Sequence, residues 1–475
     1  MKLTADDLLQ VRHERALNIE RIPKSGITGV STDSRSVKKG DLFVALHGEK
    51  FDGHDFLESV VKAGVSALCV GQTWFSLKGG WLAGSTVPTV VVKDTTRALG
   101  ELARVYRRKF NIPVLAVGGS NGKTTTKEMI ANVLRSKYPV LSTEGNLNNH
   151  IGVPQTIFRL EKKHKAAVVE VGTNHAGEIA YLCEVLEPTH GLLTNIGHEH
   201  LEFFRDLNGV VKAEGELFAW LSKHAKQGGT SAVAFVNADD RRLAKQASRV
   251  KKKIAYGFHT SGVAVKGTIL GFDRQGNGEI EVKPKGGKSF SVKLNVPGEH
   301  YAMNALAASA VGIAFKVPVS KIQKALAAFK AVSKRMQVLH IAGVTVINDT
   351  YNANPDSVLA ALWTLGTMKT SGKRIAVLGD MFELGSHSEE AHRSIGQAAG
   401  KAGVEYLLTH GANARLIHDA AAVPFKAHYD QKNILSEYLC ELLSAGDVVL
   451  VKGSRSMKME DVVAFLQARL QRATS

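Results

Sequence analysis

The chain has 475 residues, 44% hydrophobic and 22% charged, enough for about three globular domains and too apolar for global disorder. Its formal net charge of +17 fits either a nucleic-acid-binding face or a solvated surface that attracts anionic small substrates. We favour the second, because no aromatic residues alternate with the basic clusters at 251–253 and 283–288.

The N-terminus and the cysteines bear on the cellular compartment. Residues 1–10 carry three charged side chains and no long apolar run, which is not the pattern of a signal peptide. No stretch approaches the ~20 uninterrupted apolar residues that a membrane span needs. Cys69, Cys183 and Cys440 are far apart and odd in number, which is typical of a reducing compartment. The sequence therefore predicts a cytoplasmic protein without membrane insertion.

Residues 1–110 are predicted to form a small α/β domain. Short apolar strands are expected at 41–46 and 67–70, with a helix over 56–63 between them. A helix over 95–110 is expected to end the domain, because its apolar positions fall on one face.

Residues 111–333 are predicted to form a doubly wound α/β domain. The continuous apolar run at 112–117 is typical of a buried parallel strand. Three further strands, separated by helical segments, are expected at 166–171, 191–196 and 231–236. The alternating, Gly-rich residues 263–294 predict an antiparallel appendage, followed by an Ala-rich helix over 302–314.

Residues 334–475 are predicted to form a Rossmann-like α/β domain. Its expected strands alternate with helices and lie at 343–348, 374–378, 406–408 and 447–451. The predicted fold class is thus α/β with three domains.

A phosphate-binding turn follows the first central strand. Glycines let backbone N–H groups turn inward around phosphate oxygens, and the helix expected over 127–135 adds its positive dipole. Lys123 is expected to reach the β- and γ-phosphates of ATP, and Thr124 to ligate Mg²⁺. The alternative, an ordinary Gly-rich turn, is disfavoured by the flanking strand and helix. The expected nucleotide-binding residues of this loop are Gly119, Ser120, Asn121, Gly122, Lys123, Thr124 and Thr125.

Candidate metal ligands end the next two strands. Glu170 stands where ligands bind in open α/β sheets, and its carboxylate suits Mg²⁺. The alternative is a surface glutamate at a strand end. His198 and His200 lack the further nitrogen or sulfur ligands that zinc needs. A single imidazole in a Mg²⁺ shell and solvent-exposed loop histidines are both better supported than zinc, and for His198 we expect the exposed loop residue.

These motifs resemble the Mur ligases of peptidoglycan synthesis, over nearly the whole chain. The resemblance implies an ATP-dependent, Mg²⁺-requiring ligase that converts a carboxylate into an acyl phosphate and joins it to an amine. Residues 348–357 resemble the member that adds D-alanyl-D-alanine to UDP-N-acetylmuramoyl-tripeptide, so these are the expected substrates. We further expect a monomer that binds no nucleic acid. Because parts of the expected site fall on three domains, we also expect the domains to close for catalysis. The matching segments are 31–35, 40–46, 119–125, 144–154, 169–172, 200–202, 348–357, 378–385 and 451–455.

The resemblance also implies roles for individual residues. The expected catalytic residues are Lys123, Glu170, His200, Arg335 and Asp349. The expected ATP contacts outside the loop are Asn304, Arg335 and Asp349. The expected UDP-muramoyl contacts are Ser31, Asp33, Ser34, Arg35, Asn146 and Asn149. The expected contacts to the dipeptide or the terminal phosphate are Asn352, Asn354, Lys452 and Ser454.

Three positions depart from the family pattern. Glu214 stands where the family often carries a carbamylated lysine, and its carboxylate could supply the same negative charge to the metal. Lys212 is the alternative if the register slips by two. Tyr301 replaces the first asparagine of a His-Asn-x-x-Asn motif, and Asn348 replaces a common aspartate.

The sequence leaves three other functions open. One is a ligase such as folylpolyglutamate synthase, which the 351–355 segment and the uridine-type first domain disfavour. Another is a P-loop NTPase acting on nucleic acid, which the missing nucleic-acid motifs disfavour. The third is an inactive paralogue. The sequence also leaves open whether the third residue of the tripeptide is lysine or diaminopimelate.

Overall fold

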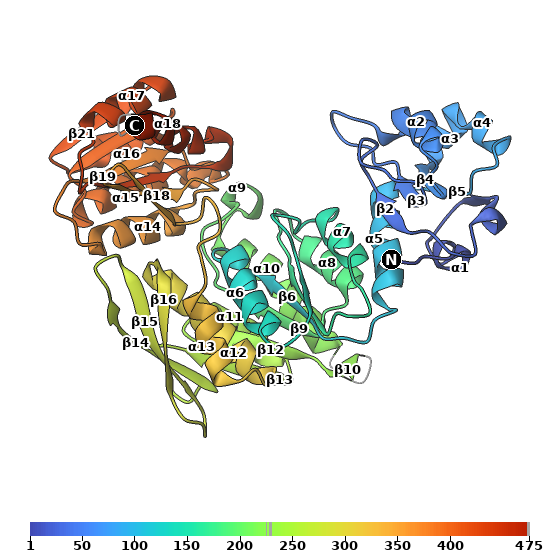
Figure 1. Ribbon diagram of the computed structural model, residues 1–475, viewed down its shortest axis with the longest axis horizontal. Helices are drawn as coiled ribbons and strands as arrows, with labels where there is room; N and C mark the ends of the chain where they lie inside the picture. Colours follow the sequence, from blue (N-terminus) through green and yellow to red (C-terminus); the bar gives the residue numbers. More distant parts are fainter. Residues whose placement is uncertain (225, 228–229, 473–475) are drawn as a thin grey trace.

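The computed structural model describes residues 1–224, 226–227 and 230–472. Three large sheets organise this part of the chain, with five, nine and six strands in chain order. Figure 1 shows the three units in turn: blue on one side, green and yellow in the centre, and orange to red on the other side. This arrangement confirms the predicted α/β fold. No helix among the described residues has the length and hydropathy to cross a bilayer.

The first sheet has the strand order β1-β5-β4-β3-β2, with β1 antiparallel to β5 and the other pairs parallel. Every residue of β3, β4 and β5 except Gly71 is buried, because apolar runs can face helices on both sides of a sheet. The elements are β1 (Arg15–Leu17), β2 (Gly29–Ser31), β3 (Asp41–Val44), β4 (Ala67–Gly71), β5 (Thr89–Val92), α1 (Ala5–Leu9), α2 (Leu57–Lys62), α3 (Gln72–Lys78), α4 (Gly80–Ala83) and α5 (Thr95–Arg107).

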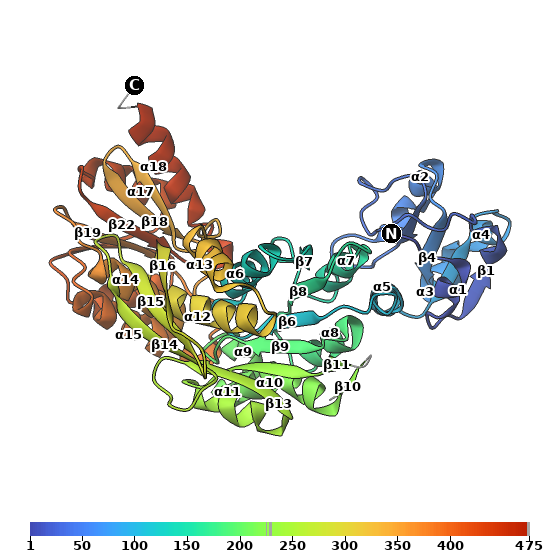
Figure 2. The same cartoon turned by 60° about the horizontal axis from the view of Figure 1, so that its bottom comes forward.

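Helix α5 joins the first unit to the second. Asp94 caps its N-terminus by accepting hydrogen bonds from the N–H groups of Thr96 and Arg97. At its other end, the buried Arg107 donates to the carbonyl of Leu186, which ends α8 (Glu178–Leu186). Figure 2 shows α5 between the first sheet and α8. The helix is therefore held by both units.

The central sheet has the strand order β16-β15-β14-β13-β12-β9-β6-β8-β7. Strand β6 lies between β8 and β9, all parallel, so their carboxyl ends form a crevice where ligands bind in such folds. The strands are β6 (Val114–Gly118), β7 (Val140–Ser142), β8 (Ala166–Glu170), β9 (His190–Leu193), β12 (Val233–Asn237), β13 (Lys252–Gly257), β14 (Val265–Phe272), β15 (Asn277–Pro284) and β16 (Phe290–Pro297); β10 (Lys226–Gln227) and β11 (Thr230–Ser231) pair separately.

The segment predicted as an antiparallel appendage is antiparallel, but it is part of the central sheet. Strands β14, β15 and β16 pair antiparallel, and β14 pairs parallel with β13. The helices that cover this sheet are α6 (Lys123–Arg135), α7 (Gly152–Phe158), α8, α9 (Leu201–Phe204), α10 (Leu207–Lys223), α11 (Arg241–Gln246), α12 (Glu299–Ala314) and α13 (Val319–Ala327).

The third sheet has the strand order β17-β18-β22-β19-β20-β21, and only its edge strand β17 is antiparallel among the described pairs. The four predicted strands are present, whereas β17 and β21 were not predicted. The elements are β17 (Gln337–Ile341), β18 (Val344–Asp349), β19 (Arg374–Gly379), β20 (Tyr406–His410), β21 (Phe425–Tyr429), β22 (Val448–Lys452), α14 (Pro355–Thr367), α15 (Ser388–Lys401), α16 (Ala414–Ala420), α17 (Lys432–Leu442) and α18 (Glu460–Arg472).

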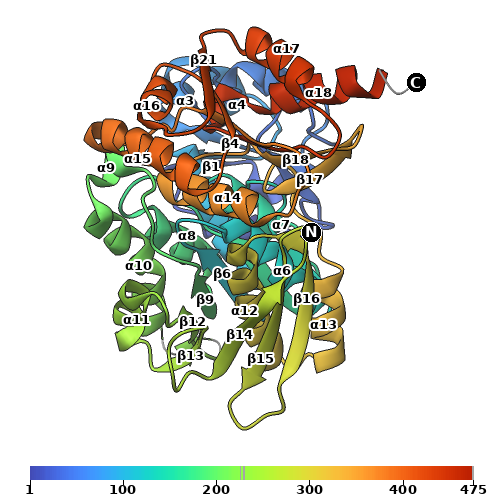
Figure 3. The same cartoon turned by 90° about the vertical axis from the view of Figure 1, so that its left-hand side faces the viewer.

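The turn between β14 and β15 contacts α14 of the third unit. The Phe272 ring packs edge-on against Trp363, with 5.4 Å between ring centroids. Lys369, just beyond α14, donates its N–H to the carbonyl of Arg274 at 3.0 Å. Figure 3 shows the three antiparallel strands extending away from α14. The extension of the central sheet therefore braces the third unit.

Candidate active site

The phosphate loop is a tight turn between β6 and α6. Gly119 and Gly122 have φ angles of 109° and 79°, in the left-handed region that favours glycine. A Cβ atom on Gly119 would lie 2.4 Å from Thr194 Oγ1, so only glycine fits there. Helix α6 begins at Lys123, four residues before the predicted start. The three threonines of its first turn are weak helix formers, which hid this start in the sequence.

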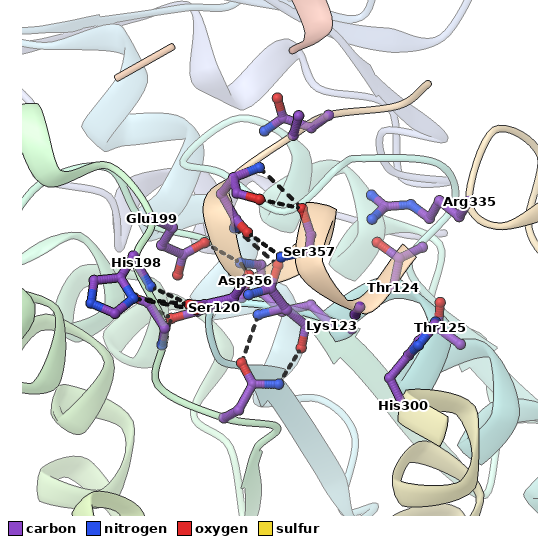
Figure 4. A pocket seen from close by; sticks show the side chains of 18 of the residues that line it. Ser120, Lys123, Thr124, Thr125, His198, Glu199, His300, Arg335, Asp356 and Ser357 are labelled. Carbon is purple, nitrogen blue, oxygen red and sulfur yellow. Dashed lines mark hydrogen bonds and ion pairs between the residues drawn. The ribbon is translucent and has the colours of Figure 1, made fainter. Parts of the chain in front are cut away.

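A cavity of about 580 Å³ opens at the carboxyl ends of β6, β8 and β9, and the third unit forms its other wall. Figure 4 shows Glu199 and His198 on one side of Lys123, with Arg335 and His300 on the other. The cavity brings together most of the predicted catalytic and nucleotide-binding residues. Those that line it are Ser120, Asn121, Gly122, Lys123, Thr124, Thr125, Glu170, His200, Asn304, Arg335, Asp349, Asn352, Asn354 and Lys452.

Three glutamates act on the Lys123 ammonium. Glu199 Oε2 is 3.2 Å from Lys123 Nζ, and both side chains are largely buried. Burial alone would lower the pKa of Lys123, but the charges of Glu199, Glu214 and Glu170 outweigh it and raise that pKa. Lys123 therefore stays protonated and can bind an anion.

Each of these glutamates has one buried oxygen without a hydrogen-bond partner among the described residues. The atoms are Glu170 Oε2, Glu199 Oε1 and Glu214 Oε1. Buried carboxylate oxygens are costly unless a cation or a donor satisfies them, so the negative charge gathered here fits a hard divalent cation such as Mg²⁺. No three His, Cys, Asp or Glu side chains in the described ranges are arranged to hold a metal by themselves. Bound Mg²⁺ would therefore share phosphate oxygens and water, as is usual for this ion.

The structure favours Glu214 over Lys212 at the position of the carbamylated lysine. Glu214 is fully buried on α10, and its Oε2 accepts the Gly119 N–H at 2.7 Å. Burial raises the pKa of the Glu214 carboxyl, against the charge of Lys123, which lowers it. Lys212 is exposed on the same helix. Glu214 therefore contacts the phosphate loop directly, although it does not line the cavity.

The two loop histidines join the central unit to the third. His200 Nδ1 lies 2.5 Å from Glu383 Oε2, and the φ of His200 is 51°. His198 Nδ1 lies 3.2 Å from Asp356 Oδ2, and 49% of the His198 side chain is exposed. The expectation of an exposed His198 is thus met, but it also has a partner in the third unit.

Residues of the third unit reach the cavity from the segment before β17, from the end of β18 and the loop after it, and from the end of β22. The Arg335 guanidinium stacks over the Tyr351 ring at 3.8 Å from its centroid. Asp349 Oδ2 pairs with the buried Lys452 Nζ at 2.6 Å, and Lys452 also donates to the carbonyl of Asn352 at 2.8 Å. A ligand of Asp349 would therefore have to share this carboxylate with Lys452.

Tyr301 and Asn348, the two residues that replace common family residues here, each have a hydrogen-bond partner, and so does the retained Asn304. The buried Tyr301 donates its hydroxyl hydrogen to the carbonyl of Arg335 at 2.8 Å. Asn304 Oδ1 accepts from Thr126 Oγ1 at 3.0 Å and lies beside Gly122. Asn348 is buried, accepts from Thr350 Oγ1 and does not line the cavity. Tyr301 therefore anchors the backbone of Arg335.

Ser454 was expected to contact a substrate, but it does not line the cavity. Its Oγ accepts the N–H of Phe382 at 2.8 Å and is buried between two loops. Asn146 and Asn149 are exposed and also lie outside the cavity lining. Asn149 Oδ1 accepts the N–H of Gly152, the first residue of α7.

The expected uridine contacts lie in the first unit and outside the cavity. These are Ser31, Asp33, Ser34 and Arg35. Asp33 and Arg35 form a two-pronged pair, and the hydrogen bonds from Arg35 hold the pKa of Asp33 at about 2. Next to them, Thr32 Oγ1 accepts from Gln155 of α7 at 3.2 Å. Their loop thus faces the central unit.

Among the cavity-lining residues that sequence reasoning missed, four make hydrogen bonds to other residues of the site. Glu199 contacts Lys123, and Asn148 donates to Glu170 Oε1 at 2.8 Å. Asn195 Oδ1 accepts the N–H of Asn121, and Asp356 accepts the N–H of His198. Glu199 stands between His198 and His200, which were considered as metal ligands, so its position in the sequence could have marked it as a candidate site residue.

Comparison with known proteins gives consistent results for all three units. Residues 26–107 match the model of the Mur ligase family catalytic domain, 117–312 the Mur ligase middle domain and 334–455 the Mur ligase glutamate ligase domain.

Full-length relatives extend this agreement. The UDP-N-acetylmuramoyl-tripeptide–D-alanyl-D-alanine ligase of Escherichia coli is 37% identical, over 93% of this chain and 94% of its own. The crystal structure of MurF from Acinetobacter baumannii is 31% identical and superposes with a TM-score of 0.87, covering 99% of both chains. The MurF ligase of Thermotoga maritima in complex with ADP is 29% identical, with a TM-score of 0.80 over 94% of this chain and 98% of its own. The chain therefore belongs to the Mur ligase family.

Proposed function

We propose that this protein is the ATP-dependent ligase that adds D-alanyl-D-alanine to UDP-N-acetylmuramoyl-tripeptide in peptidoglycan precursor synthesis. One observation carries the proposal: the phosphate-loop Lys123, the buried Glu170 and Glu199, and Arg335 of the third unit line one cavity, and the buried Glu214 accepts a hydrogen bond from the phosphate loop. The relatives of nearly full length, named for this activity, support the substrate assignment.

The reaction that we propose has two steps. The terminal carboxylate of the tripeptide attacks the γ-phosphorus of ATP, the bond to ADP breaks, and an acyl phosphate forms. The neutral amine of D-alanyl-D-alanine then attacks the acyl carbon, inorganic phosphate leaves with the former carboxylate oxygen, and the proton that the nitrogen loses passes to the departing phosphate. Both steps gather negative charge, so charge neutralisation contributes more than proton transfer.

Each element of the cavity has a role in this scheme. Lys123 and the N-terminus of α6 bind the phosphates, and Arg335 approaches from the third unit. Thr124, Glu170, Glu214 and His200 are our candidates for holding Mg²⁺ directly or through water. Mg²⁺ would neutralise the charge that develops on the transferred phosphoryl group. Asp349 and Asn304 are proposed nucleotide contacts.

We assign the UDP-muramoyl substrate to a domain at 1–110, ATP to 111–333 and the dipeptide to 334–475. The contact between Thr32 and Gln155 supports the first assignment, because it brings the 31–35 loop to the central unit. Asn352, Asn354 and Lys452 line the third-unit wall, which supports the last. We propose that the protein is a monomer and binds no nucleic acid. We also propose a cytoplasmic location, and the three free cysteines fit that reducing compartment.

A coupled assay tests the proposal. Phosphate release from ATP should require both the UDP-linked tripeptide and D-alanyl-D-alanine, and DNA or RNA should not stimulate it. Mass spectrometry should detect the pentapeptide product. Release with glutamate and a folate instead would favour folylpolyglutamate synthase, and no release with any substrate would indicate an inactive paralogue.

Variants connect that activity to the cavity. Lys123→Ala should lower kcat at least about a hundredfold, because the main counter-charge of the phosphates is lost. Lys162→Ala, a change at an exposed residue of the central unit, is the matched control and should keep full activity. Equal activity of the two variants would contradict the proposed nucleotide site.

A further inference from the structure

The Glu199 carboxylate contacts the phosphate-loop lysine. Its Oε2 is 3.2 Å from Lys123 Nζ, its side chain is only 7% exposed, and it lines the cavity. Its other oxygen, Oε1, has no hydrogen-bond partner among the described residues. Of the three buried glutamates, it alone has a described hydrogen bond with Lys123; Glu214 accepts from Gly119 and Glu170 from Asn148.

A phosphate on Lys123 would lie close to this carboxylate. A phosphate oxygen bonded to Lys123 Nζ at about 2.9 Å cannot be more than about 6 Å from Glu199 Oε2. Two negative charges at that separation repel strongly in a partly water-excluded cavity. The phosphates would also have to share the ammonium with Glu199, because Lys123 Nζ already donates to Glu199 Oε2 and to the carbonyl of Ser120. Nucleotide binding therefore carries an electrostatic cost that a divalent cation would offset.

We propose that Glu199 makes nucleotide binding conditional on a bound divalent cation. The Glu199 carboxylate repels the phosphates of a metal-free nucleotide and so weakens its binding. A bound divalent cation offsets this repulsion. This is a selectivity role for magnesium-bound over free nucleotide. It rests on the proposed function, in which the nucleotide binds at Gly119–Thr125.

Titration calorimetry with ADP tests this role. The dissociation constant is measured with excess Mg²⁺ and with EDTA, for the wild type, Glu199→Gln and Glu202→Gln. Glu202 is an exposed glutamate on the neighbouring helix α9 and serves as the matched control. In the wild type, Mg²⁺ should tighten ADP binding strongly. Glu199→Gln should tighten metal-free ADP binding at least about tenfold and reduce the effect of Mg²⁺ in the same proportion. Glu202→Gln should behave like the wild type.

Two further variants guard against a folding defect. Glu199→Asp keeps the charge and should retain most of the magnesium dependence. Glu199→Ser is a second neutral variant, used if Glu199→Gln fails to unfold cooperatively on heating.

The possible failures are distinguishable. If the wild type does not bind ADP even with Mg²⁺, the proposed function itself fails. If the wild type binds but the neutral variants show unchanged metal-free affinity, only the role of Glu199 is overturned. Weaker Mg-ADP binding with unchanged metal-free affinity would also overturn it, and would make Glu199 a ligand of the metal instead.

Discussion

Asn354, the residue that caps α14 in the third unit, donates from its Nδ2 to Asn121 Oδ1 of the phosphate loop at 2.9 Å. Asn121 is in turn held by Asn195, whose Oδ1 accepts the Asn121 N–H at 2.9 Å. A direct hydrogen bond thus links the third unit to the phosphate loop. A displacement of α14 must either break this hydrogen bond or move the loop.

Replacing Asn354 by serine should separate this contact from the helix cap. Serine is a good N-cap, so α14 should keep its stability, but its side chain is too short to reach Asn121. We expect kcat to fall about ten- to hundredfold, because the third unit is no longer held in register with the phosphates. Steady-state kinetics and ADP titration measure the two effects, and ADP affinity should change less than threefold. Asn354→Ala, which also loses the cap, should in addition lower the melting temperature.

Glu214 and Lys212 can be told apart by mutation. Glu214→Ala should lower kcat about a hundredfold, since it removes a buried carboxyl group and the acceptor of the Gly119 N–H. Lys212→Ala should have no effect, because this side chain is exposed. Wild-type activity should not respond to bicarbonate, whereas Glu214→Lys should regain activity if bicarbonate carbamylates the new lysine. Full activity of Glu214→Ala would show that the metal site needs no carboxylate at this position.

Tyr301→Phe should loosen the backbone that carries Arg335. The change removes the 2.8 Å hydrogen bond to the Arg335 carbonyl and should cost about 1 kcal/mol of stability. Because Arg335 lines the cavity, kcat should also fall. Tyr138→Phe is the matched control, since Tyr138 donates to the carbonyl of Phe315 away from the cavity. Both variants should lower the melting temperature, but only Tyr301→Phe should change kcat.

The joint between α5 and the central unit should weaken in acid. Burial by itself would raise the pKa of Glu187, but hydrogen bonds and charges from Arg108 and Arg104 outweigh it and lower that pKa. The lowered pKa contributes stability that is fully present above the unfolded value of 4.5 and is lost as pH falls through the folded pKa. The melting temperature should therefore fall more steeply with decreasing pH in the wild type than in Glu187→Gln. Parallel curves would show that the joint does not depend on this charge.

Features carried by one local segment could be predicted from the sequence. The phosphate loop lies between a buried strand and a helix, and Glu170 directly ends a strand, so both positions follow from the local pattern. Strands β17 and β21 were missed because both lie at sheet edges and are only partly buried, which leaves a weak apolar signal.

Features that depend on packing between distant segments could not be predicted. The Glu199 contact with Lys123 joins residues 76 positions apart, and the pair of His198 with Asp356 joins two units. Ser454 shows the same limit. Its motif suggested a substrate contact, but the fold uses its hydroxyl to hold Phe382 and lines the cavity with the neighbouring Lys452 instead.

The two ends of the antiparallel extension of the central sheet should tolerate inserted residues unequally. At Gly276, between β14 and β15, an added Cβ atom would meet Met368 of the third unit at 3.2 Å. At Gly286, between β15 and β16, it would meet nothing within 4 Å. A peptide tag placed after Gly286 should therefore leave the fold and activity of the enzyme unchanged. The same tag at Gly276 should disrupt the contact between this turn and the third unit.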